Sequence, residues 1–480
     1  MLPARPAMSL SQSITSKFLP IRRSAPIMIS QTESESAVAV QPLFAGGKAA
    51  LAGHGPLIRD SLGYLMSKVV PGFFGLISVP VFVRLLGVRE YGRLSVILPV
   101  LMALGGAGSG WLQQGILRFH PASEPLPEAE PPFAQAVTLG TTLAAVALGL
   151  ALLPVMGVLH SPPSVWIIGE AYCAVQLIYM VSLTSLQAQL RPRAVLRNEA
   201  LRAFAGFVLP VCLILGSGHR EFPLIILGLA LGYLLPLLFT RGRLSALFQV
   251  HRFLGTGPGF EARKILGQLW RFGWAIGLWL MLCQALPVVG RSAIQRYAGY
   301  AQAGIYASLY ELAVRSFSLF ASPVQQAAHP RIMRYWNMGD YAAARATIRH
   351  SILLQIVIFL PIEALGVMFA GPLTRLILGS GNVVPNSLLP LLMLGGFLWQ
   401  IAHLVHKPLE IMQRTKTMLC GMLGVLLIEL GGNYLLVPRF GMQSVVYVFL
   451  LGAIAYIVFA ALYGRISLQH PGSAPAASSL

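Results

Sequence analysis

Long apolar stretches separated by short polar connections recur along almost the whole chain. A helix needs about 20 mainly apolar residues to cross the roughly 30 Å hydrocarbon core of a bilayer, and about twelve stretches meet that requirement. An integral membrane protein built only from helices is therefore predicted. We expect the spans at 61–82, 94–117, 133–158, 164–187, 200–217, 222–240, 268–290, 303–327, 350–371, 386–406, 417–437 and 442–463.

Composition and charge agree with this prediction and add an orientation. The 480 residues are 56% hydrophobic and only 11% charged, and the 35 Lys and Arg residues outnumber 16 acids. The basic residues are scattered among the connections and form no single cluster, which argues against nucleic acid as a partner. Roughly 25 of them fall on the side of both termini and about 8 on the other side, so the positive-inside rule places both termini in the cytoplasm.

The connections also divide the chain into parts. We expect a disordered cytoplasmic tail at 1–56, a six-helix bundle at 57–240, a basic cytoplasmic linker at 241–267, a second six-helix bundle at 268–465 and a short disordered tail at 466–480. The first tail holds no apolar run long enough for a signal peptide or a span.

A cationic, glycine-containing connection occurs in both halves. "VRLLGVREYGRLSV" begins at Val83 and "QRYAGYAQAGIYAS" at Gln295. A spacing of 212 residues matches Arg84 to Arg296, and the same spacing matches the glycines at 87 and 92 to those at 299 and 304. Since six spans separate the copies, the halves share one orientation, and we predict a parallel repeat with the substrate route between its halves.

Three stretches carry a resemblance to a known family. "YLMSKVVPGFFGLISVPVFVRLLGVREYG" (Tyr64–Gly92), "RSAIQRYAGYAQAGIYASLYELA" (Arg291–Ala313) and "NYLLVPRFGMQSV" (Asn433–Val445) resemble bacterial polysaccharide flippases of the Wzx type. These belong to the multidrug/oligosaccharidyl-lipid/polysaccharide (MOP) exporter superfamily, and the likeness extends over about 57–465. One departure is Gly290, where such proteins often carry an Asp before the Arg, so no role of that acid is carried over.

The resemblance implies a fold and a cargo. It implies two six-helix bundles in a V-shaped, MATE-like arrangement around a central cavity, placed in the bacterial inner membrane. The implied partners are an oligosaccharide linked to undecaprenyl pyrophosphate, membrane lipids and other membrane proteins of polysaccharide assembly. It implies a flippase for O-antigen, capsule or exopolysaccharide synthesis that works by alternating access.

Two basic side chains lie deep inside predicted spans. Lys68 is near the middle of the first span, and Arg315 lies in the eighth, one helical turn after Glu311. Because charged residues within a membrane mark substrate pathways by default, we expect Lys68 and Arg315 to bind an anionic group. The structural alternatives are a Lys that reaches a water defect and an Arg315–Glu311 ion pair with no other role. An anion that competes for Arg315 would turn the pair into a gate.

Further charged residues have weaker assignments. Arg84, Arg291 and Arg296 are predicted to rim the outer mouth of the cavity, with surface anchoring as the alternative. Glu363, which follows Pro361, and Glu429 lie within spans and are candidates for proton or sodium coupling, with a neutral, inert carboxyl as the alternative.

A further cluster lies at the end of the tenth span. In "HLVHKPLEIMQR", the side chains of His403, His406, Lys407, Glu410 and Arg414 are predicted near one face at the cytoplasmic surface, suited to an anionic headgroup. The Lys beside the histidines argues against a metal. The chain contains no P-loop motif, so we expect no cofactor and transport driven by a proton or sodium gradient or by removal of the product.

Alternative functions stay open at this stage. A multidrug antiporter and a peptidoglycan-precursor flippase share the superfamily, although cationic residues favour anionic cargo and peptidoglycan-precursor flippases usually have fourteen spans. A membrane polysaccharide polymerase or ligase belongs to a different class. The outer connections are short, which argues against such an enzyme, so no catalytic residue is predicted.

Overall fold

The computed structural model describes most of the chain beyond the first tail. The described residues are 55–119, 131–158, 162–189, 191–240, 259–379, 381–382, 384–412 and 414–469. Residues from Pro56 onward form one compact unit, to which all contacts below belong. Residues 1–54 of the predicted tail (1–56), residues 241–258 of the predicted linker and the end of the chain from 470 lie outside the described residues.

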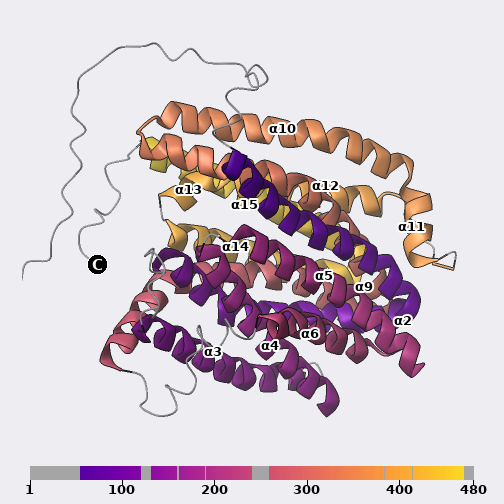
Figure 1. The fold of residues 1–480 in the computed structure, drawn as a ribbon. Coiled ribbons are helices and arrows are strands. Elements are labelled where there is room, and N and C mark those ends of the chain that lie inside the picture. The colour runs from indigo at the N-terminus through magenta and orange to yellow at the C-terminus, as the bar shows by residue number, and fades with distance from the viewer. Residues whose placement is uncertain are drawn as a thin grey trace, which may run out of the picture. The chain divides into compact units, whose positions relative to one another are not determined.

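Every regular element in the described residues is a helix (Figure 1). The bounds are α2 Gly55–Phe119, α3 Pro131–Val158, α4 Pro163–Ala188, α5 Pro192–Ser217, α6 Phe222–Phe239, α9 Phe260–Asn337, α10 Tyr341–Met368, α11 Ala370–Leu378, α12 Leu388–Val405, α13 Lys407–Ile411, α14 Thr415–Phe440 and α15 Met442–Gln469. Ten of them are long and apolar enough to cross a membrane.

Two of these ten helices are too long to be single spans, and each is interrupted by one glycine. Gly87 lies inside α2 with φ 79° and ψ 161°, and Gly299 lies inside α9 with φ 84° and ψ 170°. Only glycine adopts this region readily, because a Cβ would clash with the neighbouring backbone. Each interruption divides its helix into two spans, so the described residues contain the twelve predicted spans.

Most helix packing lies within the predicted halves, although α3 of the first half also packs on α9 of the second. α4 and α5 pack on α6, and α3 packs on α4, whereas α12 and α14 pack on α15, and α10 packs on α9 and α12. The interior of both halves is apolar and closely packed, and much of the apolar side-chain surface of the outer helices is exposed, as expected for contact with lipid. The all-helical fold with two six-helix bundles is confirmed.

The two interrupted segments, which we call the elbows (residues 83–96 and 295–308), pack against each other with the symmetry of the repeat. A Cβ added to Gly92 would overlap the carbonyl oxygen of Tyr300, and one added to Gly304 would overlap the carbonyl oxygen of Val88. Tyr300 and Gly304 stand 212 residues after Val88 and Gly92. The two backbones therefore touch reciprocally, as a two-fold relation between parallel repeats requires. The halves are thus in contact at the end of the protein where the elbows lie, which we call the elbow end, and this end is closed.

Candidate functional site

A cavity of about 620 Å³ lies between the two halves. Its walls come from α2, α4, α5 and α6 of the first half and from α9 of the second. Among its lining residues, the charged ones are three arginines and one glutamate: Arg202, Arg291, Arg315 and Glu311. The lining is therefore net cationic, and serine and tyrosine hydroxyls supply most of its remaining polarity.

Three of these four residues form one ion-paired group on α9, which we call the Arg–Glu–Arg triad. Arg291 Nη2 lies 2.6 Å from Glu311 Oε1, and Arg315 Nε lies 2.7 Å from Glu311 Oε2. The Arg291 side chain is 2% exposed, whereas that of Arg315 is 38% exposed toward the cavity. One carboxylate thus neutralises a fully buried guanidinium and holds a second one that remains reachable by a ligand.

The triad also binds the other half of the protein. Arg291 Nη1 donates to the carbonyl oxygen of Ser95 at 3.1 Å, and Arg315 Nη1 donates to the carbonyl oxygen of Gly75 at 2.7 Å. Ser95 and Gly75 lie on α2, on either side of the elbow glycine. Charge-assisted hydrogen bonds of this kind are about twice as strong as neutral ones. The triad therefore connects α9 to α2 at the wall of the cavity.

Arg202 on α5 brings positive charge to the cavity from the first half, and it is absent from the sequence-based predictions. Its guanidinium pairs with Glu199 at 3.1 Å and lies 5.4 Å from the ring centre of Tyr233. Glu199 also accepts a hydrogen bond of 2.7 Å from the Tyr179 hydroxyl. The i, i+3 spacing of Glu199 and Arg202 was a usable signal, because two charges on one helical face inside a membrane protein suggest a pair.

The structure places the predicted substrate-binding residues unevenly. The predicted Arg315–Glu311 pair is present. Arg291 is not at a rim but 99% buried, because α9 stays helical beyond residue 290 and its interruption at Gly299 brings Arg291 against Glu311. Arg84 and Arg296 are exposed and do not line the cavity, and Arg84 Nη2 donates to the carbonyl oxygen of Leu376 at the end of α11. Lys68 lies on α2, but its side chain is outside the described residues.

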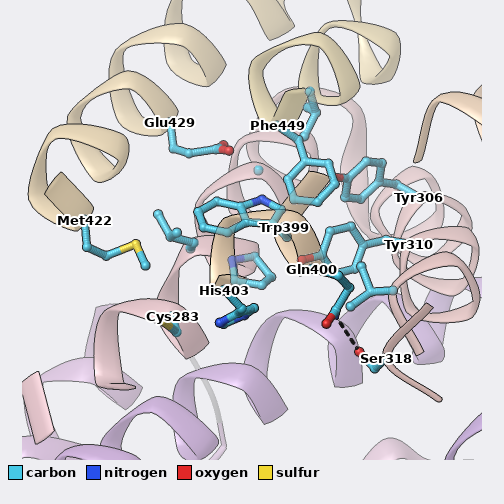
Figure 2. A pocket seen from close by; sticks show the side chains of 15 residues that line it. Cys283, Tyr306, Tyr310, Ser318, Trp399, Gln400, His403, Met422, Glu429 and Phe449 are labelled. Carbon is cyan, nitrogen blue, oxygen red and sulfur yellow. Dashed lines mark hydrogen bonds between the residues drawn. The ribbon is translucent and has the colours of Figure 1, made fainter. Parts of the chain in front are cut away.

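The two predicted coupling acids outside the triad have different surroundings. Glu363 lies half-buried on α10 after Pro361, and one of its carboxyl oxygens is buried without a hydrogen-bond partner in the described part of the chain. It lines neither of the two cavities. Glu429 on α14 is 4% exposed and accepts a hydrogen bond of 2.6 Å from Asn433. It lines a second cavity of about 210 Å³ inside the second half, toward whose aromatic wall its carboxyl group points (Figure 2).

The cluster expected at the cytoplasmic surface is partly internal. His406 is 3% exposed and His403 lines the second cavity (Figure 2), so neither presents an open surface to a headgroup. Lys407 already pairs with Glu410 at 2.5 Å. The prediction of a single basic face for an anionic headgroup is therefore wrong for the two histidines, because packing against α9 and α15 encloses them. Among the described residues, no group of three or more His, Cys, Asp or Glu could hold a metal ion.

Comparison with known proteins identifies the fold. No protein-family model matches the chain, and no curated protein matches it. Solved structures do match. An outward-facing multidrug resistance MATE transporter of the MOP superfamily aligns with a TM-score of 0.61 at 15% identity, over 86% of this chain and 95% of its own. A MOP superfamily transporter from Pyrococcus furiosus gives 0.60 at 13% identity over 86% and 95%.

A third match extends the same picture. A MATE transporter from Vibrio cholerae aligns with a TM-score of 0.55 at 14% identity, over 88% of this chain and 97% of its own. At such identities the likeness establishes the arrangement of the helices and leaves the cargo open. All three neighbours are transporters and none is an enzyme. The chain is a multi-pass membrane protein with the fold of the MATE transporters of the MOP superfamily.

Proposed function

We propose that the protein is a flippase that moves an oligosaccharide linked to a polyprenyl pyrophosphate across the bacterial inner membrane, with both termini in the cytoplasm. The observation that carries this proposal is the cavity between the halves, whose charged lining is three arginines against one glutamate. A charge moved from water into hydrocarbon meets a barrier of about 20 kcal/mol by the Born estimate. Guanidinium groups lower that barrier for a phosphate because they replace its water with hydrogen bonds in a matching planar geometry.

The triad offers a way to couple cargo to movement. A pyrophosphate in the cavity competes with Glu311 for Arg315, the more exposed of the two arginines. When Arg315 turns toward the phosphate, its hydrogen bond to the Gly75 carbonyl is lost. The connection that Arg315 makes between α9 and α2 then opens, and the closed elbow end is weakened. Cargo binding thereby favours the state in which the elbows separate.

The main alternative is a multidrug antiporter with the same fold. Export of organic cations calls for an acid that is free to face the cargo, and Glu311 is the only acid among the described lining residues and is held by two arginines. The Pyrococcus furiosus neighbour is described as having a binding pocket of reversed polarity that suggests a different function. We therefore infer the charge of the cargo from the charged residues that line the cavity, and these favour an anion.

The volume of the cavity limits what it holds in this state. About 620 Å³ is within the usual range of roughly 300–1,000 Å³ for small-molecule sites. It accommodates a pyrophosphate and the first sugars of a chain, while the polyprenyl tail stays in lipid. A longer oligosaccharide requires the halves to move apart, as alternating access provides.

The proposal is tested by locating the lipid-linked sugar in cells depleted of the protein. Polyprenyl-pyrophosphate oligosaccharides are extracted from spheroplasts before and after treatment with an impermeant glycosidase or periodate. We expect finished lipid-linked oligosaccharide to accumulate in a protected, cytoplasmic-leaflet pool. Depletion without any protected pool would contradict the proposal, and loss of resistance to cationic dyes in the same cells would support the multidrug alternative.

Arg202 provides a second expected result. Arg202→Gln should lower cargo export about 10- to 100-fold, since a hydrogen bond to a charged group is worth about 1.5–3 kcal/mol. Export is measured as surface polysaccharide per molecule of membrane-inserted protein. The matched control is Arg197→Gln, because Arg197 is an exposed residue on the same helix. Equal export by the two variants would show that Arg202 does not bind the cargo.

A further inference from the structure

Besides the cargo cavity, the second half contains a polar route that the proposed flipping does not use. It begins where α12 meets α13, at a partly exposed group of charged side chains, and ends at Glu429 in the second cavity. We propose that this route binds and conducts protons, with Glu429 as the internal proton-binding site and His406 and His403 as the relay. The inference goes beyond the proposed function and rests on one expectation from the sequence, namely that an ion gradient drives transport.

The outer end of the route is accessible and rich in exchangeable protons. Glu410 is 37% exposed and His329 on α9 is 43% exposed, with Nδ1 of His329 4.0 Å from a Glu410 carboxyl oxygen. Lys407 contacts both, at 2.5 Å from Glu410 and 3.4 Å from His329 Nδ1. A half-exposed carboxylate beside a histidine and an ammonium group is a suitable entry for protons.

His406 connects this end to the interior. Its Nε2 lies 3.7 Å from Glu410 Oε2, a distance that one water or a small rotation of the carboxylate bridges. Its Nδ1 lies 3.3 Å from the hydroxyl of Tyr456 on α15. Both ring nitrogens therefore face polar groups, although the side chain is only 4% exposed. A buried imidazole with a polar partner at each nitrogen can accept a proton on one side and release one on the other.

His403 continues the route into the second cavity. Its ring lies edge to face with that of His406, with the centroids 5.5 Å apart, and both rings contact Trp279 on α9. His403 and Glu429 line the same cavity of about 210 Å³, which is large enough for several waters. The other titratable side chains that face this space are Cys283, Tyr306 and Tyr310, all from α9. Of the titratable side chains that line this cavity, only His403 and Glu429 can carry a charge near pH 7, since thiol and phenol groups are neutral there.

Glu429 has the surroundings expected of a site that accepts a proton. Asn433 donates to one carboxyl oxygen, and the absence of a side chain at Gly452 on α15 leaves room beside the other oxygen. Oδ1 of Asn433 is buried with no hydrogen-bond partner among the residues that the structure describes. A protonated Glu429, or a water bound beside it, supplies the donor that this oxygen lacks. The pair is therefore better satisfied when the site holds one more proton.

The proton balance of the route is simple. A proton from solution reaches Glu410, directly or by way of His329, and passes from the Glu410 carboxyl to Nε2 of His406, which becomes an imidazolium. His406 then releases a ring proton through water to His403, and His403 passes one through the cavity to the Glu429 carboxylate, which becomes neutral. The reverse sequence returns the proton. Each histidine ends in the neutral state from which it began.

The route also touches the cargo cavity. Tyr310 lines both cavities, and the guanidinium of Arg291 lies 5.0 Å from the centre of its ring. Loss of charge at Glu429 thus changes the electrostatic environment on one side of Tyr310 while the triad occupies the other. The proton site and the triad therefore lie on cavities that share the Tyr310 side chain as a lining residue.

The test measures the protonation of Glu429 in the purified full-length protein, reconstituted in liposomes, without any cargo. Infrared difference spectra after a pH jump report the carbonyl stretch of a protonated carboxyl group. We expect one such band that disappears in Glu429→Gln. We expect His406→Asn to slow its appearance about 100-fold, the usual scale of a lost proton-transfer group. The matched control His219→Asn, an exposed histidine between α5 and α6, should leave the rate unchanged.

Glu410→Gln covers the case in which His406→Asn does not fold, because Glu410 is half-exposed and tolerates a change of this size. Glu410→Gln should likewise slow the appearance of the Glu429 band. Absence of a band that depends on Glu429, or equal rates in the wild type and the folded His406→Asn or Glu410→Gln variants, would overturn the proposal. Because no cargo is present, these outcomes are independent of whether the protein flips a lipid-linked oligosaccharide.

Discussion

Glu311→Gln is expected to destabilise the protein by about 3–5 kcal/mol, the usual effect of removing one partner from a buried ion pair. The substitution keeps the size of the side chain and removes its charge, so Arg291 remains 2% exposed without a counterion. Thermal unfolding in detergent, followed by the loss of monodisperse protein on size exclusion, measures the change. We expect the folded fraction to fall at temperatures that leave the wild type intact.

The control for Glu311→Gln is another glutamate paired with an arginine. Glu90 lies 2.8 Å from Arg93, and their side chains are 22% and 40% exposed. Surface pairs of this kind contribute about 0–1 kcal/mol, so Glu90→Gln should unfold close to the wild type. A double variant, Glu311→Gln with Arg291→Gln, should recover part of the lost stability because it removes the uncompensated charge. If Glu311→Gln and Glu90→Gln unfold alike, Glu311 does not hold the two arginines in the folded state.

The sequence contained enough information to predict the architecture, for a physical reason. Spans are set by the length of apolar stretches, and the elbows are set by glycines whose conformation other residues avoid. Both signals are local. The apolar stretches therefore predicted connections around residues 87 and 299, the 212-residue spacing predicted the parallel repeat, and the structure then located the interruptions at Gly87 and Gly299.

The site was only partly predictable, because its positions depend on contacts between distant segments. Arg315 and Glu311 are one turn apart, and their pairing followed from helix geometry. Arg291 lies 20 residues before Glu311 and on the other side of the elbow, so its burial became visible only once the elbow had been folded. Arg202 was not predicted because the fifth helix begins at Pro192, eight residues before the predicted span. Arg202 therefore lies farther from the start of its helix than the sequence suggested.

Gly304→Ala is expected to have the largest effect on conformation, because a new methyl group would overlap the backbone carbonyl of Val88. Overpacking against movable side chains costs about 1–3 kcal/mol, whereas a backbone oxygen yields only if the whole elbow moves. The elbows should therefore separate, and the equilibrium should shift toward the state that is open at this end. A shift of about 3 kcal/mol changes the ratio of the two states more than 100-fold.

Distances between spin labels measure this shift. Labels at Arg89→Cys and Gln302→Cys, two exposed elbow positions, in a background without the four native cysteines, should give one short distance in the parent and a longer one in Gly304→Ala. Gly92→Ala should behave like Gly304→Ala, because the repeat places it against the carbonyl of Tyr300 in the same way. Gly106→Ala, on α2 with nothing within 4 Å of the added Cβ, should keep the parent distance. If all three alanine variants keep the parent distance, contact between the elbow backbones does not close this end of the protein, and the hydrogen bonds of the triad to Ser95 and Gly75 must suffice to hold it shut.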